Sequence, residues 1–409
     1  MRGLALGLLL LLACPLAAAD LVPTGQRVVF LGDSNTYAGR FIAYLDAFLA
    51  TRHPERRVEL LNLGLPSETV SGLSEADHPY PRPNVHDRLS AVLDKTKPKL
   101  VVVCYGMNDG IYSPFDEERF KKYQQGIFTF IAACEKAGAK VVLMTPAPFD
   151  AKPLKEKVLA KGAPKYSWLR PYEKYDEEVL TKYSEWLLTL REKGYPVADP
   201  HSAILKHLET MRKDEPNYRV SGDGIHPFRN GHFLIFRELL KALEIPVKTD
   251  AQRPKINMEK NTLGLTTHLP MPLDPTWHKN FVQVEKVIDT VGDDVLFLGG
   301  ISKKKSLSVL EGDKTLFTRT EAEWISGVSL RANPDFGPNK KANEVLKLAL
   351  EKQKVLGLAW LTDVGHKRPD TPKGIPLAQA ETQVAELDKK IRELSKPSQT
   401  LLRLVPTDN

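Results

Sequence analysis

The chain has 409 residues and a formal net charge of +7, with Lys and Arg scattered among Asp and Glu. No basic block alternates with aromatic residues, so the composition argues against nucleic-acid binding and favours an ordinary mixed-charge surface. With only three cysteines the chain cannot build a framework of disulfides, and its fold must depend on a hydrophobic core.

The first nineteen residues predict an export signal that is removed from the mature chain. Arg2 precedes a Leu-rich and Ala-rich run over residues 4–12, and residues 17–19 offer a small-residue cleavage site. The run is too short to span a bilayer, which takes about 20 residues. We therefore expect a secreted or periplasmic protein without a transmembrane span. Residues 11–14 also match a bacterial lipoprotein cleavage box, so a lipid anchor at Cys14 is the alternative.

Two cysteines, Cys104 and Cys134, remain after such a cleavage, and both lie in apolar stretches. An oxidising compartment would allow a disulfide between them. We predict two buried free thiols instead, because Cys commonly packs as a small apolar residue.

Residues 26–243 alternate short β-branched runs with longer amphipathic stretches, which is typical of a parallel sheet covered by helices. We predict an α/β fold with one doubly wound, five-stranded parallel sheet. The predicted strands are 27–31, 58–61, 99–104, 140–144 and 196–198. The predicted helices are 38–52, 84–95, 116–137, 172–193, 201–213 and 229–243. Ligands of such sheets bind at the carboxyl ends of the strands, so residues that carry chemistry should follow strands directly.

A change of character near residue 245 predicts a domain boundary. Pro-rich segments such as 270–275 interrupt the alternation, which gives a signal over 1–19, an α/β domain over 20–249 and an α+β extension over 250–409. In the extension we predict a small antiparallel meander and then two helices. The predicted strands are 295–300, 306–310, 314–317 and 323–330, and the helices are 340–356 and 376–395. The apolar stripe of the last helix is expected to pack within the chain and not in a coiled coil.

Three polar segments follow predicted strands or tight turns. The first strand ends in Gly-Asp-Ser-Asn-Thr over residues 32–36, and the third ends in Tyr-Gly-Met-Asn-Asp over residues 105–109. Asp223 precedes His226 by three residues in a segment that neighbouring glycines allow to turn, so the carboxylate can take the proton of the imidazole Nδ1. Position 36 is Thr, so the Gly-x-Ser-x-Gly elbow of the α/β-hydrolases is absent.

These segments resemble the conserved blocks of the SGNH hydrolases, the superfamily that includes the GDSL lipases and esterases. The blocks occur in the order of the family, at residues 32–34, 62–64, 106–109 and 223–226. The resemblance covers residues 26–243 and implies a flavodoxin-like fold. Asn35 stands where many relatives have an aliphatic residue, and residues 64–69 lack a further Gly often found there. Both departures bear on the choice of substrate more than on catalysis.

The resemblance implies a serine ester hydrolase with Ser34 as nucleophile, His226 as base and Asp223 as the group that orients the base. The oxyanion of the tetrahedral intermediate needs fixed donors. The implied donors are the backbone N–H groups of Ser34 and Gly64 and the side-chain amide of Asn108. Asp33 and Asp109 are expected directly behind these groups, without contact to the substrate.

No metal or other cofactor is expected. A metal site of Asp223, His226 and His232 is disfavoured, because the histidines are six residues apart and no second acidic cluster joins them. We interpret His232 as a capping or core histidine.

The expected substrate is a small-molecule or carbohydrate ester, and a carbohydrate O-acyl group, such as acetyl, is favoured. The loop over residues 146–171 follows the fourth strand and must overhang the site, and it carries six basic residues with Tyr166 and Trp168. This composition is typical of a polar rim that can stack on sugars and not of a broad apolar lid. A lipase or lysophospholipase is the alternative among enzymes. A polysaccharide-binding or envelope-binding protein without turnover is the alternative from another class.

Overall fold

The computed structural model describes residues 21–22, 24–247, 255–259, 261–287, 295–299 and 305–408. The predicted export signal and Cys14 lie outside these described residues. None of the helices in the described part of the chain is long and apolar enough to cross a membrane.

A five-stranded parallel sheet forms the centre of the molecule, in the strand order β2-β1-β3-β4-β5. Its strands are β1 (Arg27–Gly32), β2 (Glu59–Asn62), β3 (Leu100–Cys104), β4 (Lys140–Met144) and β5 (Val197–Ala198). This order is that of the flavodoxin-like folds, which confirms the predicted α/β class. The direction of winding reverses between β1 and β3, so the crevice of the fold opens at the carboxyl ends of these two strands.

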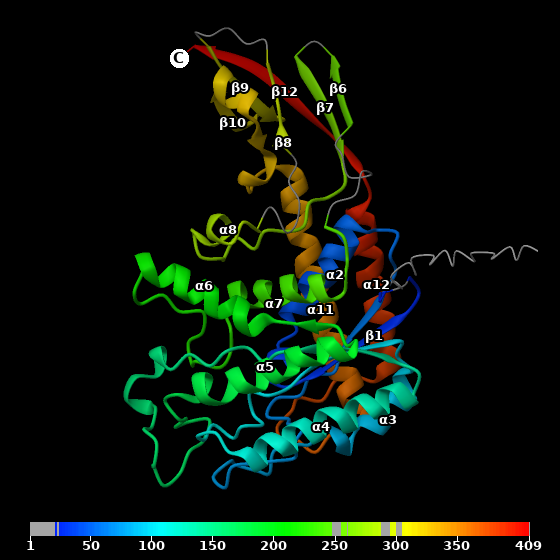
Figure 1. The fold of residues 1–409 in the computed structure, drawn as a ribbon. Coiled ribbons are helices and arrows are strands. Elements are labelled where there is room, and N and C mark those ends of the chain that lie inside the picture. Colours follow the sequence, from blue (N-terminus) through cyan, green and yellow to red (C-terminus); the bar gives the residue numbers. More distant parts are fainter. Residues whose placement is uncertain are drawn as a thin grey trace, which may run out of the picture.

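Helices cover both faces of this sheet, as Figure 1 shows. Because successive side chains of a strand point to opposite faces, Val28 and Phe30 enter one core, and Val29 and Leu31 enter the other. One core contains α2 (Arg40–Arg52), α6 (Pro200–Asp214) and α7 (Arg229–Ala242). The other contains α3 (Leu89–Thr96), α4 (Glu117–Lys136) and α5 (Thr181–Thr189). Burial on both faces explains why the strands read as uninterrupted apolar runs.

Short helical turns complete this part of the chain. They are α1 (Ser34–Tyr37), η1 (Val85–Asp87), η2 (Lys152–Lys157), the π-helical η3 (Asp176–Leu180) and η4 (Leu190–Lys193). Cys104 and Cys134 are free thiols, as predicted. Burial raises the pKa of Cys134 to about 12.

The C-terminal part forms a second, antiparallel sheet in the order β10-β9-β12-β7-β6. Its strands are β6 (Lys255–Glu259), β7 (Thr262–Thr267), β9 (Lys305–Glu311), β10 (Lys314–Thr320) and β12 (Ser398–Asp408). The predicted runs at 306–310 and 314–317 are strands of this sheet. β6, β7 and β12 were not predicted, so the sheet is larger than the predicted meander.

The predicted strand over residues 323–330 is wrong. Thr320 and Glu323 form a capping box that begins α10 (Glu321–Ser326). Only β11 (Val328–Ser329) is extended, and it pairs with β8 (Val295–Leu296). A further helical turn, α8 (Phe281–Val284), and the 3-10 turn η6 (Leu330–Ala332) were not predicted.

The two closing helices are α11 (Gly337–Val364) and α12 (Leu377–Ser395), and α11 is longer than the predicted 340–356. Figure 1 shows α11 extending from the second sheet to the central one. It covers the edge strand β2, because the Gln353 amide donates to the Leu60 carbonyl over 3.2 Å. At Gly357 a Cβ would lie 2.8 Å from the Asn62 carbonyl oxygen, so only glycine allows this approach. The extension therefore closes an otherwise open edge of the parallel sheet.

The apolar stripe of α12 packs within the chain, as predicted. Ala380, Val384, Leu387 and Ile391 are buried, and Leu387 and Ile391 belong to the same core as α2.

A buried ion-pair cluster fastens these helices together. Lys352 of α11 lies 2.8 Å from a carboxylate oxygen of Asp46 in α2 and 2.8 Å from one of Asp388 in α12. Burial by itself would lower the pKa of Lys352, but the two carboxylates raise the pKa above its ordinary value. Lys352 is thus held in its charged form at the junction of three helices.

We expect Lys352→Ala to lower the free energy of unfolding by about 3 kcal/mol, because it leaves Asp46 buried without its cation. Denaturant-induced unfolding measures this change. Lys354→Ala is the matched control, because Lys354 lies two residues away on the exposed face. Equal unfolding midpoints for the two variants would contradict the assigned role of the cluster.

Candidate active site

Ser34 follows β1 directly and begins α1, at the crevice where the sheet reverses its winding. The buried Asp33 carboxylate caps this helix by accepting the Asn35 N–H over 2.9 Å. A Cβ at Gly32 would collide with the Thr36 side chain and lie 2.6 Å from the Cys104 carbonyl oxygen. The Gly-Asp-Ser sequence therefore gives a tight turn with a fixed serine.

The structure brings three predicted residues together. His226 Nε2 lies 2.8 Å from Ser34 Oγ, although the two residues are 192 positions apart in the sequence. His226 Nδ1 lies 2.6 Å from Asp223 Oδ2. This is the order hydroxyl, imidazole, carboxylate that a proton relay requires.

The turn that carries Asp223 and His226 is stabilised from within. Asp223 Oδ1 accepts the backbone N–H groups of Ile225 and His226 over 3.0 and 2.9 Å, and the Ser221 hydroxyl over 2.9 Å. Gly224 has φ +75°, and a Cβ there would collide with the Asp150 carbonyl oxygen. The carboxylate is thus fixed before it meets the imidazole.

The pKa values of these groups reflect the contacts. Burial would lower the pKa of His226, but the hydrogen bond and charge of Asp223, with the charge of Asp33, raise the pKa above its ordinary value. Burial would raise the pKa of Asp223, but its hydrogen bonds with His226 and Ile225 hold the pKa well below its usual range. Burial raises the pKa of Asp33 to about 6, against the opposing effects of the Asn35 N–H and His226.

The predicted oxyanion donors differ in whether their hydrogens are free or already bonded within the protein. The Ser34 N–H has no acceptor among the residues that the structure describes. The Asn108 amide donates one hydrogen to the Glu68 carbonyl over 3.1 Å, which leaves its second hydrogen free. The single N–H of Gly64 donates to Asn62 Oδ1 over 3.0 Å, so it reaches a substrate only if Asn62 releases it.

Gly64 also has a packing role. A Cβ at this position would collide with the backbone N of Tyr37 and lie 2.6 Å from the Thr36 carbonyl carbon. The second block therefore packs directly on the end of α1, the helix that begins with Ser34.

Asp109 lies behind the site, fully buried. Its Oδ1 accepts the N–H groups of Val70 and Ser71 over 2.9 and 2.8 Å. Burial raises the pKa of this carboxyl group, although these hydrogen bonds oppose the rise. Asp109 thereby fixes the segment that follows the second block.

Sequence reasoning missed the buried ion pair that supports Asn108. Arg88 binds both carboxylate oxygens of Glu68, over 2.7 and 2.6 Å, and the Tyr105 hydroxyl donates to the same carboxylate over 2.6 Å. The carbonyl of Glu68 is the acceptor that holds the Asn108 amide. Glu68 lies in the segment whose departure from the family pattern the sequence did show, but nothing there indicated Arg88 as its partner.

Tyr112 orients the other end of the same amide. Its hydroxyl donates to Asn108 Oδ1 over 2.9 Å, so the amide nitrogen must face the opposite way. Ile111 and Tyr112 have φ of +47° and +55°, a strained conformation for residues with a Cβ. The Arg82 guanidinium lies 5.5 Å from the Tyr112 ring centre and pairs with Glu75 over 2.6 Å.

The loop over residues 146–171 meets the site region at two points. The Asp150 N–H donates to the Gly224 carbonyl over 2.9 Å, within the turn that carries His226. The Trp168 N–H lies 3.4 Å from Glu75, on the Asn108 side. The Trp168 side chain is exposed.

His232 is not part of the relay. It is buried and stacks on Phe41, with ring centres 6.2 Å apart. Burial, with the charges of Arg40 and His226, lowers the pKa of His232 to about 3, so the ring is neutral.

Comparison with known proteins agrees with this architecture. Residues 30–233 match the model of the GDSL-like lipase/acylhydrolase family. A solved structure described as BT4096, a gut microbial diltiazem-metabolizing enzyme, is similar at a TM-score of 0.71 and 17% identity, over 95% of this chain and 99% of that one. Axe2, an acetylxylan esterase from Geobacillus stearothermophilus, has a TM-score of 0.39 and 20% identity, over 55% of this chain and 97% of its own. A search of curated proteins found no match.

Through residues 30–233 the chain belongs to the GDSL-like lipase/acylhydrolase family. The protein is accordingly an enzyme that hydrolyses esters. The likeness to BT4096 extends beyond this domain, so the fold of that protein includes a counterpart of the C-terminal part.

The pKa of His226 tests the contact with Asp223. We expect Asp223→Asn to lower the pKa of His226 below its ordinary value, because the burial remains while the negative charge is lost. NMR titration of the imidazole resonances measures the shift. Asp214→Asn, at an exposed position on α6, should leave the titration unchanged. If Asp223→Asn also left it unchanged, the contact would not exist in solution.

Proposed function

We propose that the protein is an exported serine esterase that removes short O-acyl groups, such as acetyl, from carbohydrates through an acyl-enzyme. The observation that supports this most strongly is the pair of contacts from His226, 2.8 Å to Ser34 Oγ and 2.6 Å to Asp223 Oδ2. A serine hydroxyl is a poor nucleophile until a base removes its proton, and this arrangement supplies that base. Such a complete relay also argues against a binding protein without turnover.

The reaction follows from these contacts. As Ser34 Oγ bonds to the ester carbonyl carbon, His226 Nε2 takes the hydroxyl proton, and Asp223 stabilises the resulting imidazolium. His226 then gives this proton to the leaving alcohol oxygen as the ester C–O bond breaks. A water molecule next attacks the acyl-enzyme with His226 again as base, which releases the acid and restores Ser34.

Two groups are ready to stabilise the negative charge on the carbonyl oxygen. They are the N–H of Ser34 and the free hydrogen of the Asn108 amide, which Tyr112 and the Glu68 carbonyl hold in one orientation. Donors that do not reorganise during the reaction supply most of this kind of stabilisation. Gly64 becomes a third donor when its N–H turns from Asn62 to the substrate.

The surroundings favour a sugar over a lipid. The loop over residues 146–171 borders the site with an exposed Trp168 and several lysines, and an aromatic face beside polar groups suits a sugar ring. An acyl chain of a lipid would need a broad apolar surface, whereas the loop exposes only Trp168 and Leu169 as large apolar side chains. Export is supported by the signal-like pattern of residues 1–19.

Labelling with a fluorophosphonate tests the nucleophile. Attack by Ser34 Oγ on phosphorus expels fluoride and leaves a stable adduct, so we expect modification of the peptide that contains Ser34. Ser34→Ala should remain unlabelled, and Ser90→Ala, at an exposed position, should label like the wild type. Equal labelling of Ser34→Ala, or an active esterase that resists the reagent, would refute the proposed mechanism.

Removing the amide tests the oxyanion site. We expect Asn108→Ala to lower kcat/KM on an aryl acetate by about 10² to 10³. Tyr112→Phe should lower it on the order of fivefold, because one orienting hydrogen bond of about 1 kcal/mol is lost while the amide remains. Steady-state kinetics give both numbers, and circular dichroism checks that the variants fold. An unaltered rate in Asn108→Ala would show that the amide is not a donor.

A further inference from the structure

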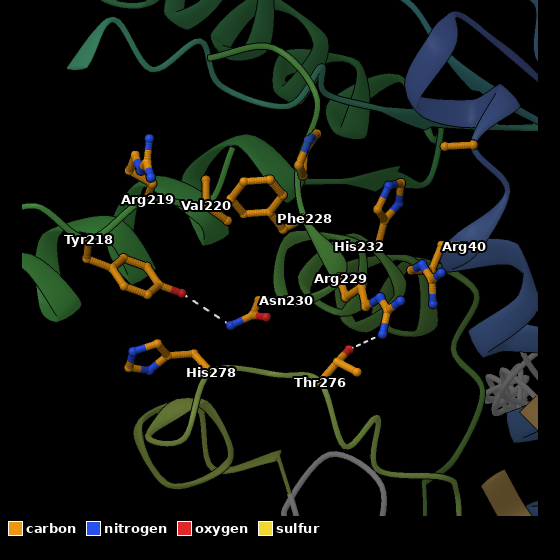
Figure 2. A pocket seen from close by; sticks show the side chains of 12 residues that line it. Arg40, Tyr218, Arg219, Val220, Phe228, Arg229, Asn230, His232, Thr276 and His278 are labelled. Carbon is orange, nitrogen blue, oxygen red and sulfur yellow. Dashed lines mark hydrogen bonds between the residues drawn. The ribbon is translucent and has the colours of Figure 1, made fainter. Parts of the chain in front are cut away.

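A cavity of about 700 Å³ lies next to Ser34 and His226, the proposed catalytic pair. Figure 2 shows the side chains around this cavity. Ala38 lines it, four residues after Ser34, and Pro227 and Phe228 line it directly after His226. At a helical rise of about 1.5 Å per residue, Ala38 is about 6 Å along the chain direction from Ser34. The cavity and the catalytic pair therefore share two segments of backbone.

The cavity is positively charged. Three arginines line it, Arg40, Arg219 and Arg229. Asp274 lies 3.4 Å from Arg40 and 3.4 Å from Arg229, so one carboxylate is shared between two guanidinium groups. Arg219 is exposed and has no acidic partner among the residues that the structure describes. His278, also in the lining, is paired with Glu215 over 3.2 Å.

The N-terminus of α7 adds to this charge. Phe228 precedes the helix and gives no side-chain cap, and Phe228, Arg229 and Asn230 all line the cavity. The first N–H groups of a helix lack partners within the helix and carry a partial positive charge. A helix of 14 residues that begins at a cavity is a favourable place for an anion.

A buried histidine also belongs to the lining. His232 lines the cavity, is 5% exposed, and its Nδ1 has no hydrogen-bond partner among the described residues.

The remaining lining suits a sugar. Asn230 donates its amide to the Tyr218 hydroxyl over 3.2 Å, a bond that Figure 2 marks with a dashed line. The ring of Phe228 is 49% exposed and offers an apolar face beside these polar groups.

We propose that this cavity is a subsite for a carboxylate or sulfate group of an acidic carbohydrate whose neighbouring O-acyl ester is cleaved at Ser34. The inference rests on the proposed function and names the substrate class of the same site. Arginine is suited to both anions, because its planar fork of donors matches their oxygens. Arg229, at the beginning of α7, and Arg219, on the opposite side of the cavity, are the guanidinium groups that can attract the anion.

The test uses acetylated disaccharides that differ only in charge. The first contains a uronic acid, the second is its uronamide, and the third carries a sulfate in place of the carboxylate. We expect kcat/KM for at least one anionic substrate to exceed that for the uronamide by about 10-fold to 100-fold, and the excess to fall as salt is added. Which anion gives the larger excess identifies carboxylate or sulfate as the group bound.

Arg219→Gln should remove most of this excess while leaving the rates on the uronamide and on p-nitrophenyl acetate unchanged. Arg229→Gln should act in the same direction, and Lys213→Gln, which removes an exposed charge on α6, should have no effect. Equal rates on charged and uncharged disaccharides, unaffected by Arg219→Gln, would overturn the subsite. Failure to cleave p-nitrophenyl acetate would instead count against the proposed function, so the two failures are distinguishable.

Discussion

The hydrogen bond between His226 and Ser34 is the interaction on which the proposed mechanism depends. It joins the first strand of the sheet to a turn 192 residues later. The turn is rigid because Asp223 satisfies two backbone N–H groups and a serine hydroxyl as well as the imidazole. The Asn35 amide lies 3.4 Å from the Ile225 carbonyl and adds a second link between the two segments. Small displacements of either segment would separate the proposed nucleophile from the proposed base.

The C-terminal part helps to hold in place the parallel sheet that carries Ser34. Its helix α11 covers β2, the strand that ends in the second block, and contacts it through Gln353 and Gly357. At its other end the Gly337 N–H donates to Glu311 of β9, which connects the helix to the second sheet. Residues 337–395 thus brace the parallel sheet, while the predicted domain boundary near residue 249 stays a prediction.

The sequence allowed much of the fold and the relay to be predicted. The strands were visible because burial on both faces makes each an apolar run. The four family blocks were visible because each follows a strand or a glycine turn. The pair of Glu68 and Arg88 could not be predicted, since 20 residues separate them and only the fold brings them together. β12 was missed because its partners β7 and β9 lie far earlier in the chain, with α10, α11 and α12 between β9 and β12. The capping box of Thr320 and Glu323 can be recognised in the sequence as the start of a helix. The apolar alternation that follows it favoured the prediction of a strand instead.

The formation of a covalent acyl-enzyme at Ser34 is the most direct test of this account. Rapid mixing of the enzyme with excess p-nitrophenyl acetate, acid quenching and mass spectrometry of the digest measure it. We expect an acetyl group on the peptide that contains Ser34, formed within the first turnover and lost as the substrate is exhausted. Steady hydrolysis with no acetylated peptide at any time would show that water attacks the ester directly and would contradict the central claim.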